Sequence, residues 1–152
     1  MAVPTTLEEF TDFFEKFTEK RGFDDIAATL GLEPAAADGE TISMTMPLSD
    51  PIAQANGMFS AAALFGAADI TGTLLAMQAY AGSGQFPLAV QSNINFMSNT
   101  TASPAVATAS ILRGGSTMAV VSASVADAEG KALVHSTFTY VIKERSLGSQ
   151  RG

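Results

Sequence analysis

The sequence predicts an α+β fold in which a curved antiparallel sheet wraps around one long, apolar helix. The helix is expected at about Gly57–Ala79, where small and apolar residues occupy nearly every face. One strand-like segment precedes it and four follow, and the chain shows no further helical periodicity after it. A helix that is apolar all round must be covered on most sides, and a sheet that curls around it provides that cover.

Size and composition indicate one folded domain. The chain has 152 residues, of which 47% are hydrophobic and 15% charged, so it can bury one core and does not resemble a disordered chain. We expect the domain to span residues 1–143, with residues 144–152 as a flexible tail. The absence of cysteine excludes disulfides, thiolate catalysis and zinc–thiolate sites.

Charge and segment composition restrict the partners and the compartment. The formal net charge is −7 and the eight Lys and Arg residues form no stripe, which disfavours nucleic acid as a partner. One histidine, and acidic residues without ligand spacing, predict no metal site and no cofactor. The first residues lack the features of a signal peptide, and the apolar residues 58–77 include Asp69, two threonines and two glycines. We therefore expect a cytoplasmic protein that does not cross a membrane.

The first helix is predicted at about residues 6–20. Either Thr5 or Thr6 can cap it, because a glutamate lies three residues after each of them. Its apolar residues recur at helical spacing and make one face, which consists of Leu7, Phe10, Phe13, Phe14 and Phe17. We expect this face to dock onto the domain or onto a neighbouring subunit.

Five strands are predicted from alternating apolar and polar residues. The first begins at about Gly39 and ends at Pro47, and residues 48–56 form a loop that leads into the central helix. The four later strands are expected at Leu88–Met97, Ala105–Arg113, Met118–Ala126 and Ala132–Ile142. The last two connections are short and contain glycine, as hairpin turns do. We therefore expect these four strands to form an antiparallel meander.

Asp69 is the main candidate for a functional group. It lies in the most hydrophobic segment of the chain, where an unpaired carboxylate is costly to bury and its pKa rises. Thr73 lies four residues later on the same helix face, and Ala62 and Gly66 extend this face with small residues that leave room for a ligand. In the alternative interpretation Asp69 is a solvated or interface residue that only hydrogen-bonds to Thr73 and a nearby backbone.

The segment from about Gly39 to Ile142 resembles the acyl-CoA thioesterases of the hotdog superfamily, in the branch of the phenylacetate-degradation and 4-hydroxybenzoyl-CoA thioesterases. The resemblance rests on Asn56-Gly57 before the helix, on the small pair Ala61-Ala62, and on Asp69 seven residues after that pair. Further matches are the strand Asn93–Met97 and the hairpins Leu112–Gly115 and Asp127–Lys131. The resemblance implies the hotdog fold, a curved sheet around a central helix.

The resemblance also implies roles for individual residues. Asp69 would activate water or attack the thioester, Thr73 would help to hold the water, and the backbone N–H of Ala61 would polarise the thioester carbonyl. Gln54 would contact the carbonyl or the acid across a dimer interface. Many relatives read His-Gly-Gly where this chain has Ser60-Ala61-Ala62, a change that keeps the N–H and adds methyl groups. The expected substrate-binding residues are Asn56, Gly57, Ser60, Ala62, Asn93, Asn95 and Arg113.

These roles require more than one chain. Ala61 and Asp69 are eight residues apart, about 12 Å along a helix, which is too far for both to act on one carbonyl. We therefore expect acyl-CoA as the substrate and self-association as a homodimer or a dimer of dimers, which is a homotetramer. The acyl group stays open, because an aromatic ring and a medium aliphatic chain both suit Met58, Phe59, Phe65 and Met77.

Thioester hydrolysis, with the helix carboxylate as base or nucleophile, is the function that these observations favour. A hotdog hydratase would pair a histidine with the acid, but His135 falls on a late strand. A non-catalytic acyl-CoA binding or sensing protein is the other alternative, because the same pocket without a competent acid would still bind its ligand.

Overall fold

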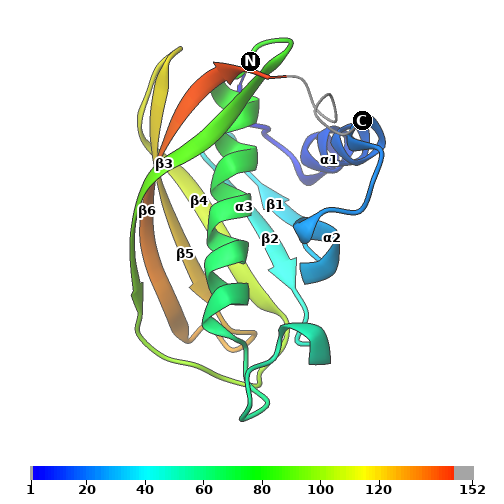
Figure 1. Ribbon diagram of the computed structural model, residues 1–152, viewed down its shortest axis with the longest axis vertical. Coiled ribbons are helices and arrows are strands. Elements are labelled where there is room, and N and C mark those ends of the chain that lie inside the picture. Colours follow the sequence, from blue (N-terminus) through cyan, green and yellow to red (C-terminus); the bar gives the residue numbers. More distant parts are fainter. Residues whose placement is uncertain (1, 146–152) are drawn as a thin grey trace.

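The computed structural model describes residues 2–145, which form a six-stranded antiparallel sheet curved around one long helix, α3 (Ala61–Tyr80) (Figure 1). Two shorter helices, α1 (Leu7–Arg21) and α2 (Ile26–Leu30), precede the sheet; α1 packs against the first strand and α2 against α3. The predicted α+β arrangement of a sheet wrapped around a central helix is confirmed.

The helix α1 begins and ends at capping residues. Thr6 is the N-cap, and its hydroxyl accepts from the backbone N–H of Glu9 at 3.1 Å, while the Glu9 carboxylate accepts from the backbone N–H of Thr5 at 2.8 Å. Gly22 ends the helix in the left-handed region, with φ of 75°. Phe10 is wholly buried, so the phenylalanine face docks onto the domain. Of the two expected positions, the domain and a neighbouring subunit, the structure shows the first.

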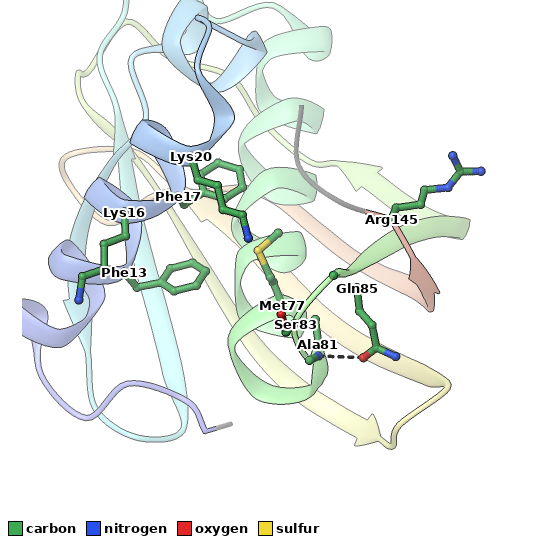
Figure 2. Close-up of a pocket in the computed structure, with 11 residues that line it drawn as sticks. Phe13, Lys16, Phe17, Lys20, Met77, Ala81, Ser83, Gln85 and Arg145 are labelled. Carbon is green, nitrogen blue, oxygen red and sulfur yellow. Dashed lines mark hydrogen bonds between the residues drawn. The ribbon is translucent and has the colours of Figure 1, made fainter. Parts of the chain in front are cut away.

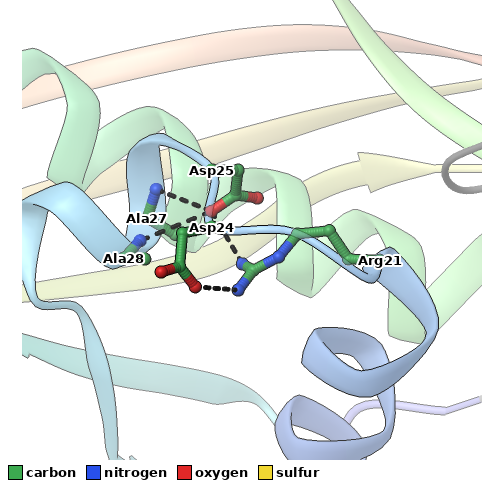
Figure 3. Close-up of polar contacts among 5 residues, drawn as sticks. All are labelled: Arg21, Asp24, Asp25, Ala27 and Ala28. Atoms are coloured by element: carbon green, nitrogen blue, oxygen red, sulfur yellow. Dashed lines mark hydrogen bonds and ion pairs between the residues drawn. The ribbon is translucent and has the colours of Figure 1, made fainter. Parts of the chain in front are cut away.

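A partly buried ion pair joins the end of α1 to the start of α2 (Figure 3). The Asp25 carboxylate caps α2 by accepting from the N–H groups of Ala27 and Ala28, and it also accepts from the Arg21 guanidinium at 2.7 Å. The Arg21 side chain is only 6% exposed. The sequence did not predict α2. The contact between Arg21 and Asp25 fixes its position, and the corner between α1 and α2 forms one wall of a cavity beside Asp69.

The central helix begins later than predicted. Gly57 adopts a φ of 80° in a turn that its N–H closes on the Gln54 carbonyl, and Phe59 forms an isolated bridge with Ala53. The helix therefore begins at Ala61, with Ser60 as its N-cap, so the predicted start near Gly57 is too early. A short 3₁₀ helix, η1 (Asp50–Ile52), lies in the loop before it. By length and composition α3 could span a membrane, but most of its residues are buried inside this domain.

The sheet has the strand order β1-β2-β4-β5-β6-β3. The hairpins β4–β5 and β5–β6 confirm the predicted meander, but the expectation that β3 belongs to it is wrong, because β3 pairs with β6 along its whole length. Both edges of β4 are already paired, with β2 and β5, so β3 has no edge of β4 to join. The strands are β1 (Glu33–Ala37), β2 (Thr41–Met46), β3 (Gln85–Phe96), β4 (Ala105–Gly114), β5 (Met118–Ala126) and β6 (Ala132–Glu144).

Two strands of the sheet differ from the sequence prediction. The edge strand β1 was not expected, and it contains Pro34, which an edge strand tolerates because one side needs no hydrogen bonds. The last strand in the chain, β6, continues to Glu144, so this residue belongs to the sheet and not to the predicted tail. Residues 146–152 of that tail lie outside the described residues.

Candidate active site

Asp69 lies in the middle of α3 with its carboxylate half-buried against the sheet. The hydroxyl of Tyr140, on β6, donates to its Oδ1 at 3.0 Å and lies 2.8 Å from its backbone oxygen. Burial raises the pKa of Asp69, and hydrogen bonds from the side chains of Tyr140 and Thr73 lower it in part. The geometry therefore provides a carboxylate whose proton affinity is increased and whose orientation is fixed by a neighbouring hydroxyl.

Tyr140 is held firmly beside this carboxylate. It is wholly buried, and its ring stacks on Phe138 at 6.0 Å between centroids, while Phe138 meets Phe65 of α3 edge-on at 5.5 Å. Burial raises the pKa of Tyr140 far above its usual range, and the negative charge of Asp69 raises it further. The phenol therefore remains protonated and serves as a hydrogen-bond donor to Asp69.

Gly72 leaves the space that this contact requires. A Cβ atom at Gly72 would lie 2.7 Å from the Tyr140 hydroxyl, closer than Cβ contacts normally come. Glycine inside a helix reduces helix stability, by roughly 0.5–1 kcal/mol relative to alanine. Its presence one turn from Asp69 lets Tyr140 approach the helix and donate to the carboxylate.

Two cavities meet at Asp69. The first, which we call the inner cavity, has a volume of about 270 Å³ and lies between α3, the α1–α2 corner and the first half of β3. The second, the edge cavity, has a volume of about 440 Å³ and lies between α3 and the middle of β3. Asp69 and Ala89 line both. Besides Asp69, Thr73 and Asp25, the inner cavity is lined mainly by apolar side chains, among them Phe17, Ile26, Ile70, Leu74, Phe86 and Leu88.

The start of α3 presents free backbone donors. The Ser60 hydroxyl caps the helix by accepting from Ala63 N–H at 3.1 Å, and within residues 2–145 no acceptor is found for the N–H groups of Ala61 and Ala62. Both alanines are exposed. Such N–H groups carry partial positive charge and suit a developing oxyanion. Because Ala61 lies about 12 Å from Asp69 along the helix, its N–H and the Asp69 carboxylate of the same chain are too far apart to act on one carbonyl.

The other predicted residues do not line the cavities at Asp69. Gln54, Asn56 and Gly57 form the turn before α3, where the Gln54 side-chain oxygen accepts from Asn56 N–H. Ser60 and Ala62 line a separate cavity of about 160 Å³ against α2. The remaining three are exposed on strands: Asn93 and Asn95 on β3, and Arg113 near the end of β4. The structure thus brings Asp69 and Thr73 together within one chain, and the roles of the others stay predictions.

Tyr140 was not predicted from the sequence. Buried residues alternate with more exposed ones along β6, and Tyr140 occupies one of the buried positions, as an ordinary core tyrosine does. Tyr140 lies 71 positions after Asp69, and its contact with Asp69 depends on the strand order, so no local signal indicates it. Among residues 2–145 no group of three or more histidine, aspartate or glutamate side chains could hold a metal ion.

Comparisons with known proteins identify the family and the fold of the chain. The model of the thioesterase superfamily matches residues 56–134. No curated protein matches the sequence. Three similar solved structures have low sequence identity, so they establish the fold alone, which is the hotdog fold expected from the sequence.

A thioesterase from Haemophilus influenzae has a TM-score of 0.78 and 19% identity, with all of both chains covered. The PaaI protein of the phenylacetic acid degradation operon of E. coli has a TM-score of 0.71 and 17% identity, with 87% of this chain and 96% of that chain covered. A hypothetical thioesterase from Streptococcus pneumoniae, solved with coenzyme A, has a TM-score of 0.65 and 17% identity, with 76% and 90% covered.

Proposed function

The chain belongs to the thioesterase superfamily and is a thioester hydrolase, and on this premise we propose that it hydrolyses acyl-CoA esters with Asp69 as the catalytic carboxylate. The observation that carries the proposal is the environment of Asp69. It is a half-buried carboxylate on an apolar helix, oriented by Tyr140, and it faces two cavities large enough for part of a ligand.

The chemistry follows from the groups at the site. Asp69 removes a proton from water as the water oxygen attacks the thioester carbon, or its carboxylate attacks that carbon to give an anhydride that water then cleaves. Thr73, one turn further along α3, helps to hold the water. In both routes the carbon–sulfur bond breaks, CoA leaves as a thiol, and the acyl group leaves as a carboxylic acid.

We place the acyl group in the inner cavity. Its lining is mainly apolar and begins directly at Asp69 and Thr73, so a thioester carbon beside Asp69 would direct its acyl chain onto Phe17, Leu74 and Phe86. The edge cavity has a more polar lining, with Gln91 and Ser92, and it opens along β3. This side suits the amide-containing arm of CoA.

The proposal includes a partner subunit bound along β3. This strand pairs with β6 on one side only and ends the sheet, and a long unpaired edge of twelve residues readily accepts another strand. Val90, Phe96 and Met97 are exposed at or next to this edge. A second copy there would bring the free N–H of Ala61 and the Gln54 side chain of one chain toward Asp69 of the other.

Two experiments test the proposal. The first measures thiol release from a panel of aryl and aliphatic acyl-CoA esters; hydrolysis identifies the acyl preference, and the absence of release from every ester contradicts acyl-CoA as the substrate. The second mixes Asp69→Asn chains with Gln54→Ala chains. If each site takes Asp69 from one subunit and Gln54 from the other, random mixing restores about a quarter of the wild-type activity, because half of the dimers carry one intact site out of two. No recovery would place both residues in one chain.

A further inference from the structure

A third cavity follows the inner cavity along α3 and differs from it in charge. It has a volume of about 280 Å³ and lies between α1, the end of α3 and the turn that leads into β3 (Figure 2). We call it the basic pocket, because Lys16, Lys20 and Arg145 line it and, among residues 2–145, no carboxylate does. These are three of the eight basic residues in a chain whose formal net charge is −7, and two carboxylates lie at the rim, where Asp12 pairs with Lys16 and Glu144 accepts from the Gln85 side chain.

The pocket has an apolar wall beneath this charge. Phe13 and Phe17 project from α1 toward Met77 of α3, and all three side chains line the cavity (Figure 2). Phe17 also lines the inner cavity, so the two spaces are neighbours with one shared wall. Met77 lies eight residues after Asp69, about 12 Å further along the helix.

The three cations differ in their freedom to meet a ligand. Lys16 is held by Asp12, with Nζ and Oδ2 2.6 Å apart. Lys20 extends over the cavity toward Met77 and has no ion-pair or hydrogen-bond partner within the described residues (Figure 2). The backbone N–H of Arg145 donates to the Gly84 carbonyl at 2.7 Å, which holds Arg145 at the opposite rim. Lys20 is therefore the cation best placed to take an anion.

The turn between α3 and β3 adds one neutral donor. Ser83 lines the pocket, and within residues 2–145 its hydroxyl has no partner. Gln85 holds the turn in shape, because its side-chain oxygen accepts from Gly82 N–H at 2.8 Å (Figure 2). A hydroxyl and a cation on two sides of an apolar cavity match a ligand with an anionic head and an apolar body.

We propose that the basic pocket binds an organic carboxylate, with its head on Lys20 and its apolar body on Phe13, Phe17 and Met77. Two sources would supply this chemistry. One is a free carboxylic acid in solution, the class of compound that thioester hydrolysis releases. The other is the far end of an acyl group that carries a second carboxylate and extends from Asp69 through the inner cavity; this second source rests on the proposed function.

Binding is tested without turnover. Protein carrying ¹³C-methyl methionine is titrated with octanoate, and the methyl signal of Met77 reports the pocket, while the exposed Met97 and Met118 are internal references. We expect the Met77 signal to shift, Lys20→Leu to weaken binding about fivefold, and neutral octanamide to bind more weakly than octanoate. The matched control is Lys143→Leu, an exposed lysine on β6 that lies outside the pocket and should leave binding unchanged.

The proposal is overturned if octanoate leaves Met77 unshifted, if Lys20→Leu and Lys143→Leu bind equally well, or if octanamide binds as tightly as octanoate. The two sources are separated by comparing hydrolysis of decanoyl-CoA and decanedioyl-CoA. If the diacid ester is hydrolysed faster and Lys20→Leu abolishes this preference, the pocket binds the far carboxylate of the acyl group. If the two esters are hydrolysed at equal rates and octanoate still binds, the pocket binds a free carboxylic acid. If neither ester is hydrolysed, acyl-CoA as substrate is in question while the octanoate result stands.

Discussion

The hydroxyl of Tyr140 lies 3.0 Å from Oδ1 of Asp69 and 2.8 Å from the backbone oxygen of the same residue. One phenol thus fixes both the carboxylate and the stretch of α3 that carries it. The contact joins the last strand of the sheet to the middle of the central helix, and Gly72 supplies the space for it.

Tyr140→Phe should reduce activity and move its pH dependence. The hydrogen bond from Tyr140 lowers the pKa of Asp69, so without it the carboxylate keeps its proton to higher pH. If the charged form is the active one, the acid limb of kcat/KM shifts to higher pH and kcat falls by roughly tenfold at neutral pH. Tyr80→Phe is the matched control, because it alters the only other tyrosine of the chain and should leave the limb in place. An unshifted limb in Tyr140→Phe would show that this contact does not control Asp69.

Gly72→Ala should reduce activity and fail to stabilise the protein. Alanine normally stabilises a helix interior by roughly 0.5–1 kcal/mol relative to glycine, but here its Cβ would lie 2.7 Å from the Tyr140 hydroxyl. Displacement of the buried ring should cost about 1–3 kcal/mol in the free energy of unfolding and move the acid limb as Tyr140→Phe does.

Gly66→Ala is the comparison for this variant. Its Cβ would meet Cδ1 of Leu30 at 2.8 Å, which is a crowded contact that does not involve Tyr140. We expect Gly66→Ala to change stability in urea unfolding and to leave the pH profile unchanged. A stability gain and normal activity in Gly72→Ala would contradict the role assigned to that glycine.

Asp69→Asn should make stability less dependent on pH. The folded state raises the pKa of Asp69, so the protonated form is favoured by folding and the protein is stabilised below the unfolded pKa. This stabilisation is lost as the pH rises through the folded pKa, where a charged group becomes buried. Asp69→Asn removes the charge, so its free energy of unfolding at pH 8 should equal or exceed that of the wild type. Urea unfolding between pH 4 and pH 8 measures this, and a large loss of stability at pH 8 would contradict it.

Val90→Lys should weaken self-association and activity together. Val90 is 58% exposed, and it lies at the bulge of β3 between Ala89 and Gln91, where it also lines the edge cavity. A lysine at a strand edge disfavours pairing with another strand. Sedimentation should show a larger monomer fraction, with a parallel loss of hydrolysis. Leu112→Lys is the control, because Leu112 is 59% exposed on β4, away from the edge. Monomers that keep full activity would contradict the shared site.

The parts of the fold that were predicted depend on local pattern. The face of α1, the alternation in β2 and the two glycine hairpins need no knowledge of distant residues. The first residue of α3 was misjudged because Met58, Phe59 and Ser60 continue the apolar, small-residue pattern, whereas the left-handed Gly57 and the Ser60 cap decide the boundary. The short α2 and the alanine-rich β1 carry too few residues for periodicity to show.

The same distinction applies to the site. Asp69 and Thr73 lie on one helical turn, so their spacing alone predicts that they come together. Tyr140 and the β3–β6 pairing join residues far apart in the chain, and they depend on strand order, which local pattern does not determine. The roles of Gln54 and the Ala61 N–H depend on a second chain, so they stay predictions.

The most direct test of the central claim is thiol release from the preferred acyl-CoA ester by wild type, Asp69→Asn and Asp69→Ala, with circular dichroism to verify the fold. If Asp69 is the catalytic carboxylate, both variants should lose about 10²–10⁴-fold in kcat while they remain folded. If either variant keeps hydrolysis within a few-fold of the wild type, Asp69 is not the catalytic group and the assignment of this site is wrong.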